Sequence, residues 1–139
     1  MEKKEIAELF MKGIDCSQVV VAEELGITTE EAYKMSAAFG GGMGLGETCG
    51  AVVGAMIVLG LKYGHCEVEH MGQKDIMNAK RAEFLQKFQE KYAVCNCKGL
   101  LKHDISKPEE MQKILDEGLL FDFCPEVVKD SITILKEIF

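Results

Sequence analysis

Residues 40–61 read GGGMGLGETCGAVVGAMIVLGL, and this stretch decides the fold. Its second part, from Cys49 to Leu61, is thirteen residues of small or apolar character with a charged residue close to each end. A membrane-spanning helix needs about 20 such residues, whereas a buried helix of a globular domain needs fewer. We therefore expect a core helix from Cys49 to about Tyr63, with the rest of the chain packed around it.

The first part of this stretch holds five glycines in seven residues, which is too many for a helix. We expect a loop, and its glycines are candidate cofactor-binding residues: Gly40, Gly41, Gly42, Gly44 and Gly46. Closely spaced backbone amides before a helix start can approach an anion, here the Cys49 thiolate, a phosphate or a cofactor. The loop lacks the Gly-Lys-Ser/Thr ending of a P-loop, and a helix rather than a strand precedes it. A plain turn between helices is the alternative interpretation.

Helix signals dominate the remaining sequence. Thr28 and Glu31 form a capping box, Ser106 and Glu109 form a second one, and Asp15 is a candidate N-cap. Gly26 follows the second expected helix as its C′ residue. No segment alternates with period two, so no strand is expected. The expected helices cover residues 2–12, 16–25, 29–39, 49–63, 68–92, 107–118 and 125–139, and residues 99–101 are expected to form at most a single helical turn.

This pattern predicts an all-α fold, a compact single-domain helical bundle of about six to seven helices over residues 1–139. In the longest helix the candidate core residues are Met71, Ile76, Phe84, Leu85 and Phe88. The chain has 139 residues, of which 47% are hydrophobic, and this is enough for one buried core.

Charge and composition exclude several classes of function. The net charge of -7 argues against nucleic acid and anionic membranes as partners. No apolar segment near residue 1 resembles a signal peptide, and no run is long enough to span a membrane. We therefore expect a soluble cytoplasmic protein.

Six cysteines are a high count for a cytoplasmic chain, and in a reducing compartment they indicate metal binding or redox chemistry. Four of them fall at the expected starts of helices: Cys16, Cys49, Cys97 and Cys124. The helix dipole and free N–H groups at a helix start favour a thiolate and lower its pKa. Core filling alone would scatter cysteines through helix interiors. We therefore expect these four thiols to be reactive and to converge in space.

Small residues recur every four positions in the core helix, at Gly50 and Gly54 and at Ala51 and Ala55. Such a stripe predicts close packing against another helix. This packing would bring Cys49 near another helix start.

The other cysteines give less specific signals. Cys95-Asn96-Cys97 could chelate a metal or close a strained, oxidising disulfide, but it has no partner motif of zinc-finger type. His65, beside Cys66, is the one histidine that we consider a candidate ligand. All three histidines, His65, His70 and His103, are expected to be exposed.

The ordered cysteines and their neighbours resemble those of the redox-active family named C-GCAxxG-C-C for its spaced cysteines, over the full length of the chain. The matching residues are Cys16-Ser17, Phe39-Gly40-Gly41-Gly42, Cys49-Gly50-Ala51-x-x-Gly54, Cys97 with Leu100-Leu101, and Cys124-Pro125. The resemblance implies redox activity, genes near those of transporters, and a region shared with a split-Soret type cytochrome. Cys97 takes the third cysteine position because Leu100-Leu101 follows it, and Cys95 is its rival. The Cys-x-x-Cys-His motif is absent, so covalent haem does not carry over.

Three hypotheses follow. In the first, the chain is a thiol–disulfide oxidoreductase that needs no cofactor, with Cys49 as the attacking thiol and Cys16, Cys97 or Cys124 as the resolving thiol. In the second, the same four cysteines bind zinc or an iron–sulfur cluster as a Cys₄ set. In the third, the chain is a cofactor-binding accessory protein associated with a transporter. The separate helix starts favour the first. The sequence leaves open whether the chain has a redox partner and whether it forms a homo-oligomer.

Overall fold

The computed structural model describes residues 1–24 and 27–139. Within these residues the chain forms helices and no strand, and the elements in order are α1 (Lys3–Met11), α2 (Cys16–Glu24), α3 (Thr29–Ser36), η1 (Gly42–Gly46), α4 (Gly50–Tyr63), α5 (Met71–Tyr92), α6 (Cys97–Leu101), α7 (Pro108–Asp116), η2 (Leu119–Phe123) and α8 (Cys124–Ile138). The two η elements are short turns with π-type hydrogen bonding. The all-α prediction is confirmed, but the eight α-helices of this part of the chain exceed the expected six to seven. One reason is that the single turn at 97–101 forms a capped helix, with the Asn96 side chain accepting from Gly99 N at 2.7 Å.

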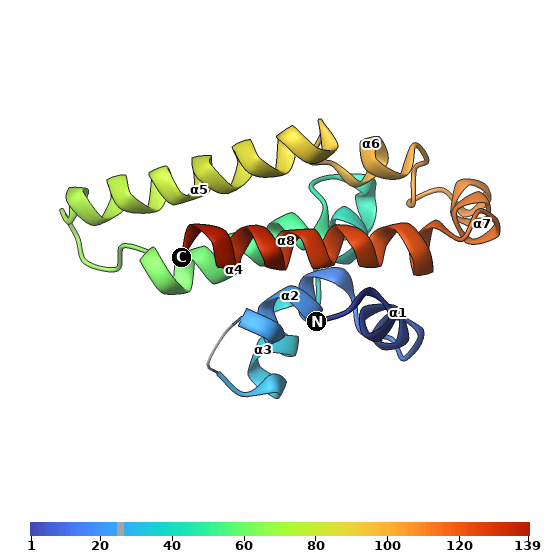
Figure 1. The fold of residues 1–139 in the computed structure, drawn as a ribbon, viewed down its shortest axis with the longest axis horizontal. Helices are drawn as coiled ribbons and strands as arrows, with labels where there is room; N and C mark the ends of the chain where they lie inside the picture. The colour runs from blue at the N-terminus through green and yellow to red at the C-terminus, as the bar shows by residue number, and fades with distance from the viewer. Residues whose placement is uncertain (25–26) are drawn as a thin grey trace.

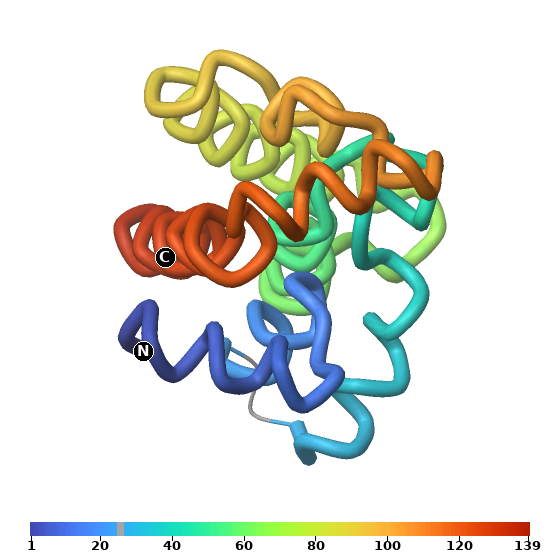
Figure 2. Tube along the Cα trace, turned by 90° about the vertical axis from the view of Figure 1, so that its right-hand side faces the viewer, coloured from blue at the N-terminus to red at the C-terminus, as the bar shows by residue number. Residues whose placement is uncertain are grey.

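The three longest helices, α4, α5 and α8, run along the long axis of the molecule (Figure 1). In both views α8 lies between α5 on one side and the group α1 to α3 on the other (Figures 1 and 2). Helix α4 packs against α2, α5 and α8, as expected for the most apolar helix. No helix within 1–24 and 27–139 is both long enough and apolar enough to cross a membrane.

Two clusters of buried apolar side chains hold the helices together. The main cluster joins α1 to α5 and α8, and its members are Ile6, Val19, Val20, Val21, Ala32, Ala51, Val52, Ala55, Val58, Leu59, Phe84, Phe88, Val127, Val128, Ile132, Ile134, Leu135 and Ile138. The small cluster joins α6 and α7 and consists of Cys97, Leu101 and Ile114. Burial of apolar area on this scale is the dominant stabilising term of folding.

Helix α5 is shorter and less buried at its start than the sequence predicted. It begins at Met71 rather than Val68, because Glu69 takes a positive φ of 61°. Phe84 and Phe88 are fully buried, but Met71 and Ile76 are 60% and 47% exposed, so their assignment to the core was wrong. The physical reason is the length of the neighbouring helix. α8 ends beside Lys80, whose Nζ donates to the Ile138 carbonyl, and the turns of α5 before Lys80 lie beyond it.

Local hydrogen bonds decide which helix boundaries were predicted correctly. Thr28 caps α3 as expected, with Oγ1 accepting from Glu31 N at 3.2 Å. The helix ends at Ser36 instead of Phe39, and the Ser36 carbonyl accepts from the Ser17 hydroxyl at 2.8 Å.

The second capping box does not form. The N-cap of α7 is Lys107, while the Ser106 amide and hydroxyl both donate to Asp104 Oδ1. The expected end of the second helix at Leu25 and Gly26 lies outside the described residues.

Candidate functional site

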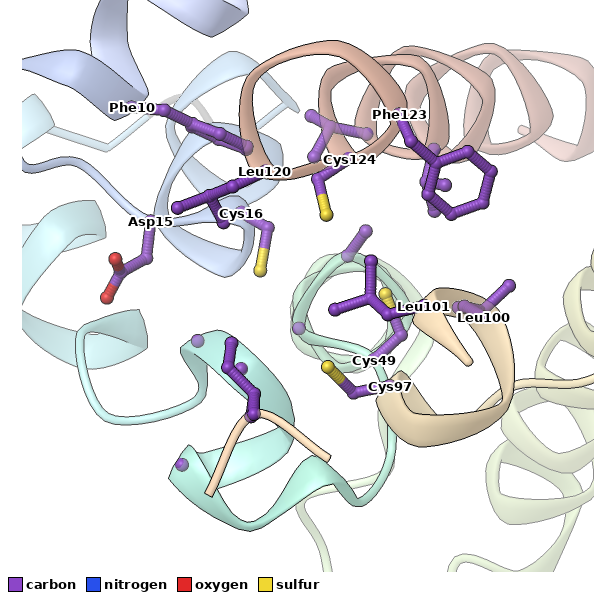
Figure 3. Close-up of a pocket in the computed structure, with 18 of the residues that line it drawn as sticks. Phe10, Asp15, Cys16, Cys49, Cys97, Leu100, Leu101, Leu120, Phe123 and Cys124 are labelled. Atoms are coloured by element: carbon purple, nitrogen blue, oxygen red, sulfur yellow. The ribbon is translucent and has the colours of Figure 1, made fainter. Parts of the chain in front are cut away.

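Four cysteines line one cavity of about 300 Å³ (Figure 3). They come from four elements that are distant in the sequence: Cys16 begins α2, Cys49 is the N-cap of α4, Cys97 begins α6 and Cys124 begins α8. The predicted convergence of helix starts is therefore present. Two positions need correction. Cys49 precedes the first turn of α4 instead of lying in it. Cys124 is the first residue of α8 instead of preceding the helix, because the right-handed turn η2 runs directly into α8 through Phe123.

The cavity lies where the two apolar clusters meet. Cys16 and Cys49 pack against the main cluster, whereas Cys124 packs against the small cluster, to which Cys97 itself belongs. Aromatic and aliphatic side chains complete the wall: Phe10, Ile105, Leu120, Phe123 and Val127. Each cluster thus contributes two thiols to one shared, largely apolar space.

The contact between α2 and α4 positions Cys16. A Cβ atom built on Gly50 would lie 2.3 Å from the Cys16 sulfur, and one built on Gly54 would lie 2.9 Å from the Ser17 carbonyl oxygen. Only residues without a side chain allow the two helices to come this close. The small-residue stripe therefore does what the sequence predicted, and it places the Cys16 thiol against the first turn of the helix that follows Cys49.

A short antiparallel pairing positions the next two thiols. Thr48 and Asn96 form an isolated antiparallel β-bridge. On either side of it, Cys49 N donates to the Cys95 carbonyl at 2.8 Å, and Cys97 N donates to the Glu47 carbonyl at 2.6 Å. The Cys97 side chain lines the cavity and is 7% exposed, whereas Cys95 is not among the lining residues. The structure therefore places Cys97, and not its rival Cys95, with the other three.

The glycine segment forms a tight left-handed turn. Gly41, Gly42, Met43 and Gly44 have φ values of 64°, 61°, 60° and 71°, and this conformation favours glycine because it lacks a Cβ atom. The prediction that an α-helix cannot continue through this segment is correct.

The five candidate glycines divide into two groups. Gly40, Gly41 and Gly44 line the cavity. Gly42 and Gly46 do not, and they are buried against other parts of the chain, where added Cβ atoms would lie 2.4 Å from Glu47 N and 2.5 Å from Lys98 Cγ. Gly42 and Gly46 therefore have a packing role.

Burial sets the protonation of the thiols. It raises the pKa of Cys16 to about 12 and the pKa of Cys49 and of Cys97 to about 11 each, and it raises the pKa of Cys124 as well. The ordinary value for a free cysteine is about 8.5. The expectation of low-pKa thiolates was wrong, because loss of water around the sulfur outweighs the helix-start amides.

Backbone amides nevertheless distinguish two of the four thiols. Amides of Gly41 and Ser17 lower the pKa of Cys16, and amides of Ala51 and Val52 lower the pKa of Cys49, in both cases by less than burial raises it. No comparable amide acts on Cys97 or Cys124 among the described residues. Cys16 and Cys49 are therefore the two positions where the chain assists a thiolate.

The four thiols are also close enough to affect one another. In addition to burial, negative charge on a neighbouring cysteine raises the pKa of each thiol, and this effect acts within every pair among Cys16, Cys49, Cys97 and Cys124. Two thiolates are thus strongly disfavoured together in this cavity. The reduced site holds neutral S–H groups at pH 7.

The remaining candidate ligands lie elsewhere. His65 and His70 are exposed as expected, and Cys66 is exposed as well. The His103 ring is partly buried instead, 3.1 Å from Glu117 Oε2. Across residues 1–24 and 27–139, no three His, Cys, Asp or Glu side chains are grouped so that they could hold a metal ion. This arrangement gives no support to the Cys₄ interpretation of the four cysteines.

The sequence analysis missed a polar group behind the cavity. The Tyr92 hydroxyl donates to the buried carboxylate of Asp130, and Lys91 Nζ lies 3.0 Å from the same carboxylate. The Tyr92 ring also meets the ring of Phe123, which lines the cavity, edge-on at 6.2 Å between centroids. The four-residue spacing of Phe84, Phe88 and Tyr92 was the signal that could have revealed it.

Comparison with known proteins agrees with the geometry. No curated protein and no solved structure matches the chain. A family model described as "Putative redox-active protein (C_GCAxxG_C_C)" matches residues 14–138, a span that includes all four cavity cysteines. Since the match covers most of the 139 residues, the chain belongs to the C_GCAxxG_C_C family.

Proposed function

We propose that the chain is a thiol–disulfide oxidoreductase in which Cys49 and Cys16 form a reversible disulfide inside the cavity. The observation that carries this proposal is the meeting of four thiols from four separate helix starts around one apolar space. Core packing alone gives no reason for four distant segments to contribute the same residue type to one cavity wall.

Three observations support the choice of Cys49 and Cys16 as the pair. Both thiols pack against the main cluster. Both have backbone amides that favour the thiolate. The Cys16 sulfur lies against Gly50, the residue directly after Cys49. Cys97 and Cys124 lie on the side of the small cluster and lack these amides.

The reaction is a two-step exchange. The Cys49 thiolate attacks one sulfur of a disulfide substrate, which forms a mixed disulfide and releases the first thiolate of the substrate. The Cys16 thiolate then attacks the Cys49 sulfur and releases the second substrate thiolate. The protein loses two electrons and two protons and gains one S–S bond, while the substrate disulfide gains both electrons and both protons and becomes two thiols.

Burial keeps the Cys49 thiol protonated at neutral pH, so the reduced protein reacts slowly as a nucleophile. A pKa of about 11 leaves roughly one Cys49 thiol in 10⁴ ionised at pH 7. The high pKa makes each thiolate intrinsically more nucleophilic, which offsets part of the loss. Such a site would react slowly with oxidants that do not bind in the cavity and faster with a molecule held beside the sulfur. A reducing compartment such as the cytoplasm is the setting that fits six free cysteines.

Peptide mapping after oxidation tests the proposal. The reduced protein would be oxidised with a limiting amount of diamide, alkylated, digested without reductant and analysed by mass spectrometry. We expect a peptide pair linked through Cys16 and Cys49, which disappears in Cys49→Ser and in Cys16→Ser. Cys66→Ser, which changes an exposed cysteine outside the cavity, is the matched control and should leave the link intact. A link between any other pair, or none, would overturn the assignment.

A further inference from the structure

We propose that the substrate of this cavity is a small, uncharged, apolar disulfide. This inference rests on the proposed function and names the class of molecule that exchanges with Cys49. It is carried by the composition of the cavity wall, by its size and by the charge around it.

In the part of the chain that the structure describes, the cavity wall offers no cationic side chain that would hold the charged group of an anionic substrate. Apart from the cysteines, the one ionisable side chain among the described lining residues is Asp15, and no Lys, Arg or His belongs to this lining. Burial raises the pKa of Asp15, which indicates that its surroundings disfavour negative charge. The net charge of -7 adds repulsion at longer range. A carboxylate- or phosphate-bearing disulfide would therefore lose its hydration in the cavity without gaining a partner.

The same wall matches an apolar molecule. The side chains of Phe10, Leu120 and Phe123 lie around the thiols, as Figure 3 shows. The free energy falls when an apolar ligand displaces water from these apolar surfaces. Binding pockets for small molecules span about 300–1,000 Å³. The cavity of about 300 Å³ lies at the lower limit, so the ligand must be small.

The position of the sulfurs argues against a protein as the direct substrate. Cys97 is 7% exposed, and Cys16 and Cys49 pack against the main cluster. Cys16 and Cys49 are partly exposed and recessed in the cavity, so a small disulfide reaches their sulfurs more easily than a disulfide held on the surface of a folded protein. A small disulfide can enter, accept the two electrons of Cys49 and Cys16, and leave as two neutral thiols.

A pair of disulfide reagents with opposite charge properties tests the inference. 4,4′-Dithiodipyridine is uncharged at neutral pH, whereas 5,5′-dithiobis(2-nitrobenzoate) is a dianion. The rate at which each closes the Cys16–Cys49 disulfide would be divided by its rate at the exposed Cys66, which corrects for intrinsic reactivity. We expect this ratio to favour the uncharged reagent by roughly tenfold or more. Equal ratios would overturn the inference.

A designed charge sharpens the test. Ile105→Lys places a cation on the cavity wall, and Leu115→Lys places one on an exposed position outside it; each changes the net charge by the same amount. We expect only Ile105→Lys to raise the normalised rate of the dianionic reagent. An equal rise in both variants would mean that overall charge, and not the cavity, selects the reagent.

The two proposals fail in different ways. If both reagents modify cavity cysteines but neither closes the Cys16–Cys49 disulfide, the proposed function is overturned and the inference falls with it. If both close it with equal normalised rates, the proposed function stands and the substrate class is overturned. Far-UV circular dichroism of each variant would verify that the helical fold is retained.

Discussion

The Cys16 sulfur lies directly against the Cα of Gly50, so close that a Cβ atom at position 50 would lie 2.3 Å from it. This contact links the start of α2 to the start of α4 and joins the two thiols that we assign to one disulfide. Real Cβ atoms do not approach other atoms to this distance, so any side chain at position 50 must displace the sulfur or the helix.

Gly50→Ala should therefore destabilise the reduced protein by about 1–3 kcal/mol, the usual cost of overpacking a core. Gly60→Ala is the matched control, because Gly60 lies in the same helix and an added Cβ would meet no atom within 4 Å. This control should be neutral or stabilise by up to about 1 kcal/mol through helix propensity. Urea unfolding under reducing conditions measures both. Equal stability of the two variants would show that the Cys16–Gly50 contact is not tight.

The left-handed turn gives a second prediction. Gly42→Ala and Gly44→Ala both place a Cβ atom at positive φ, which costs roughly 1–2 kcal/mol for an L-residue. At Gly42 the new atom would also lie 2.4 Å from Glu47 N, a backbone atom that cannot swing away, whereas at Gly44 it would meet nothing within 4 Å. We expect Gly42→Ala to be clearly the more destabilising in thermal unfolding.

Met43→Gly checks the origin of that difference. Met43 already occupies the left-handed region with a φ of 60°, and its side chain is 49% exposed. Replacing it removes an unfavourable conformation and should raise the stability by roughly 1 kcal/mol or less, after the added flexibility of the unfolded chain is counted. Loss of stability in this variant would contradict the left-handed geometry of the turn.

The reactivity of Cys49 should depend steeply on pH. Since burial raises its pKa to about 11, the thiolate fraction grows about tenfold for each pH unit between 7 and 10. Alkylation by uncharged iodoacetamide, followed at Cys49 by mass spectrometry, should rise in the same proportion. A short cysteine peptide is the control and should level off above its pKa of about 8.5. A plateau for Cys49 below pH 9 would show that its thiol is not desolvated.

The stability of the reduced protein should fall above pH 9. Folding raises the pKa values of Cys16, Cys49 and Cys97 to about 12, 11 and 11, so between pH 9 and 11 the unfolded chain loses protons that the folded chain keeps. Unfolding then releases protons, and the free energy of unfolding decreases as pH rises. Comparison with Cys16→Ala over the same pH range isolates the effect, because other titrating groups cancel. Parallel curves for the two proteins would contradict it.

Much of the helical architecture follows from local sequence. The apolar run before Tyr63 and the Thr28 cap are signals that act within one or two turns, and each formed the element that was predicted. The glycine stripe at Gly50 and Gly54 also predicted a close helix contact, because residues without side chains allow another helix to approach the backbone closely.

Two other sequence signals failed because a group outside the pattern overrode them. Ile76 has the right spacing for a core residue of α5, but α8 ends too early to cover it. Ser106 has the right spacing for a capping box, but Asp104 takes its hydrogen bonds. In both cases the sequence spacing fits the predicted role, but a group outside the pattern prevents the residue from taking that role.

The sequence by itself determined that four cysteines stand at or beside helix starts, because capping and helix-breaking residues act locally. Only the tertiary structure decided that these thiols share one cavity, that Cys97 and not Cys95 lines it, and that their pKa values are raised instead of lowered. A helix start supplies amides from its own first turn, whereas the loss of water around a sulfur depends on every element packed above it. At Cys49 desolvation outweighs the amides of Ala51 and Val52, and no pattern within α4 could have revealed that balance.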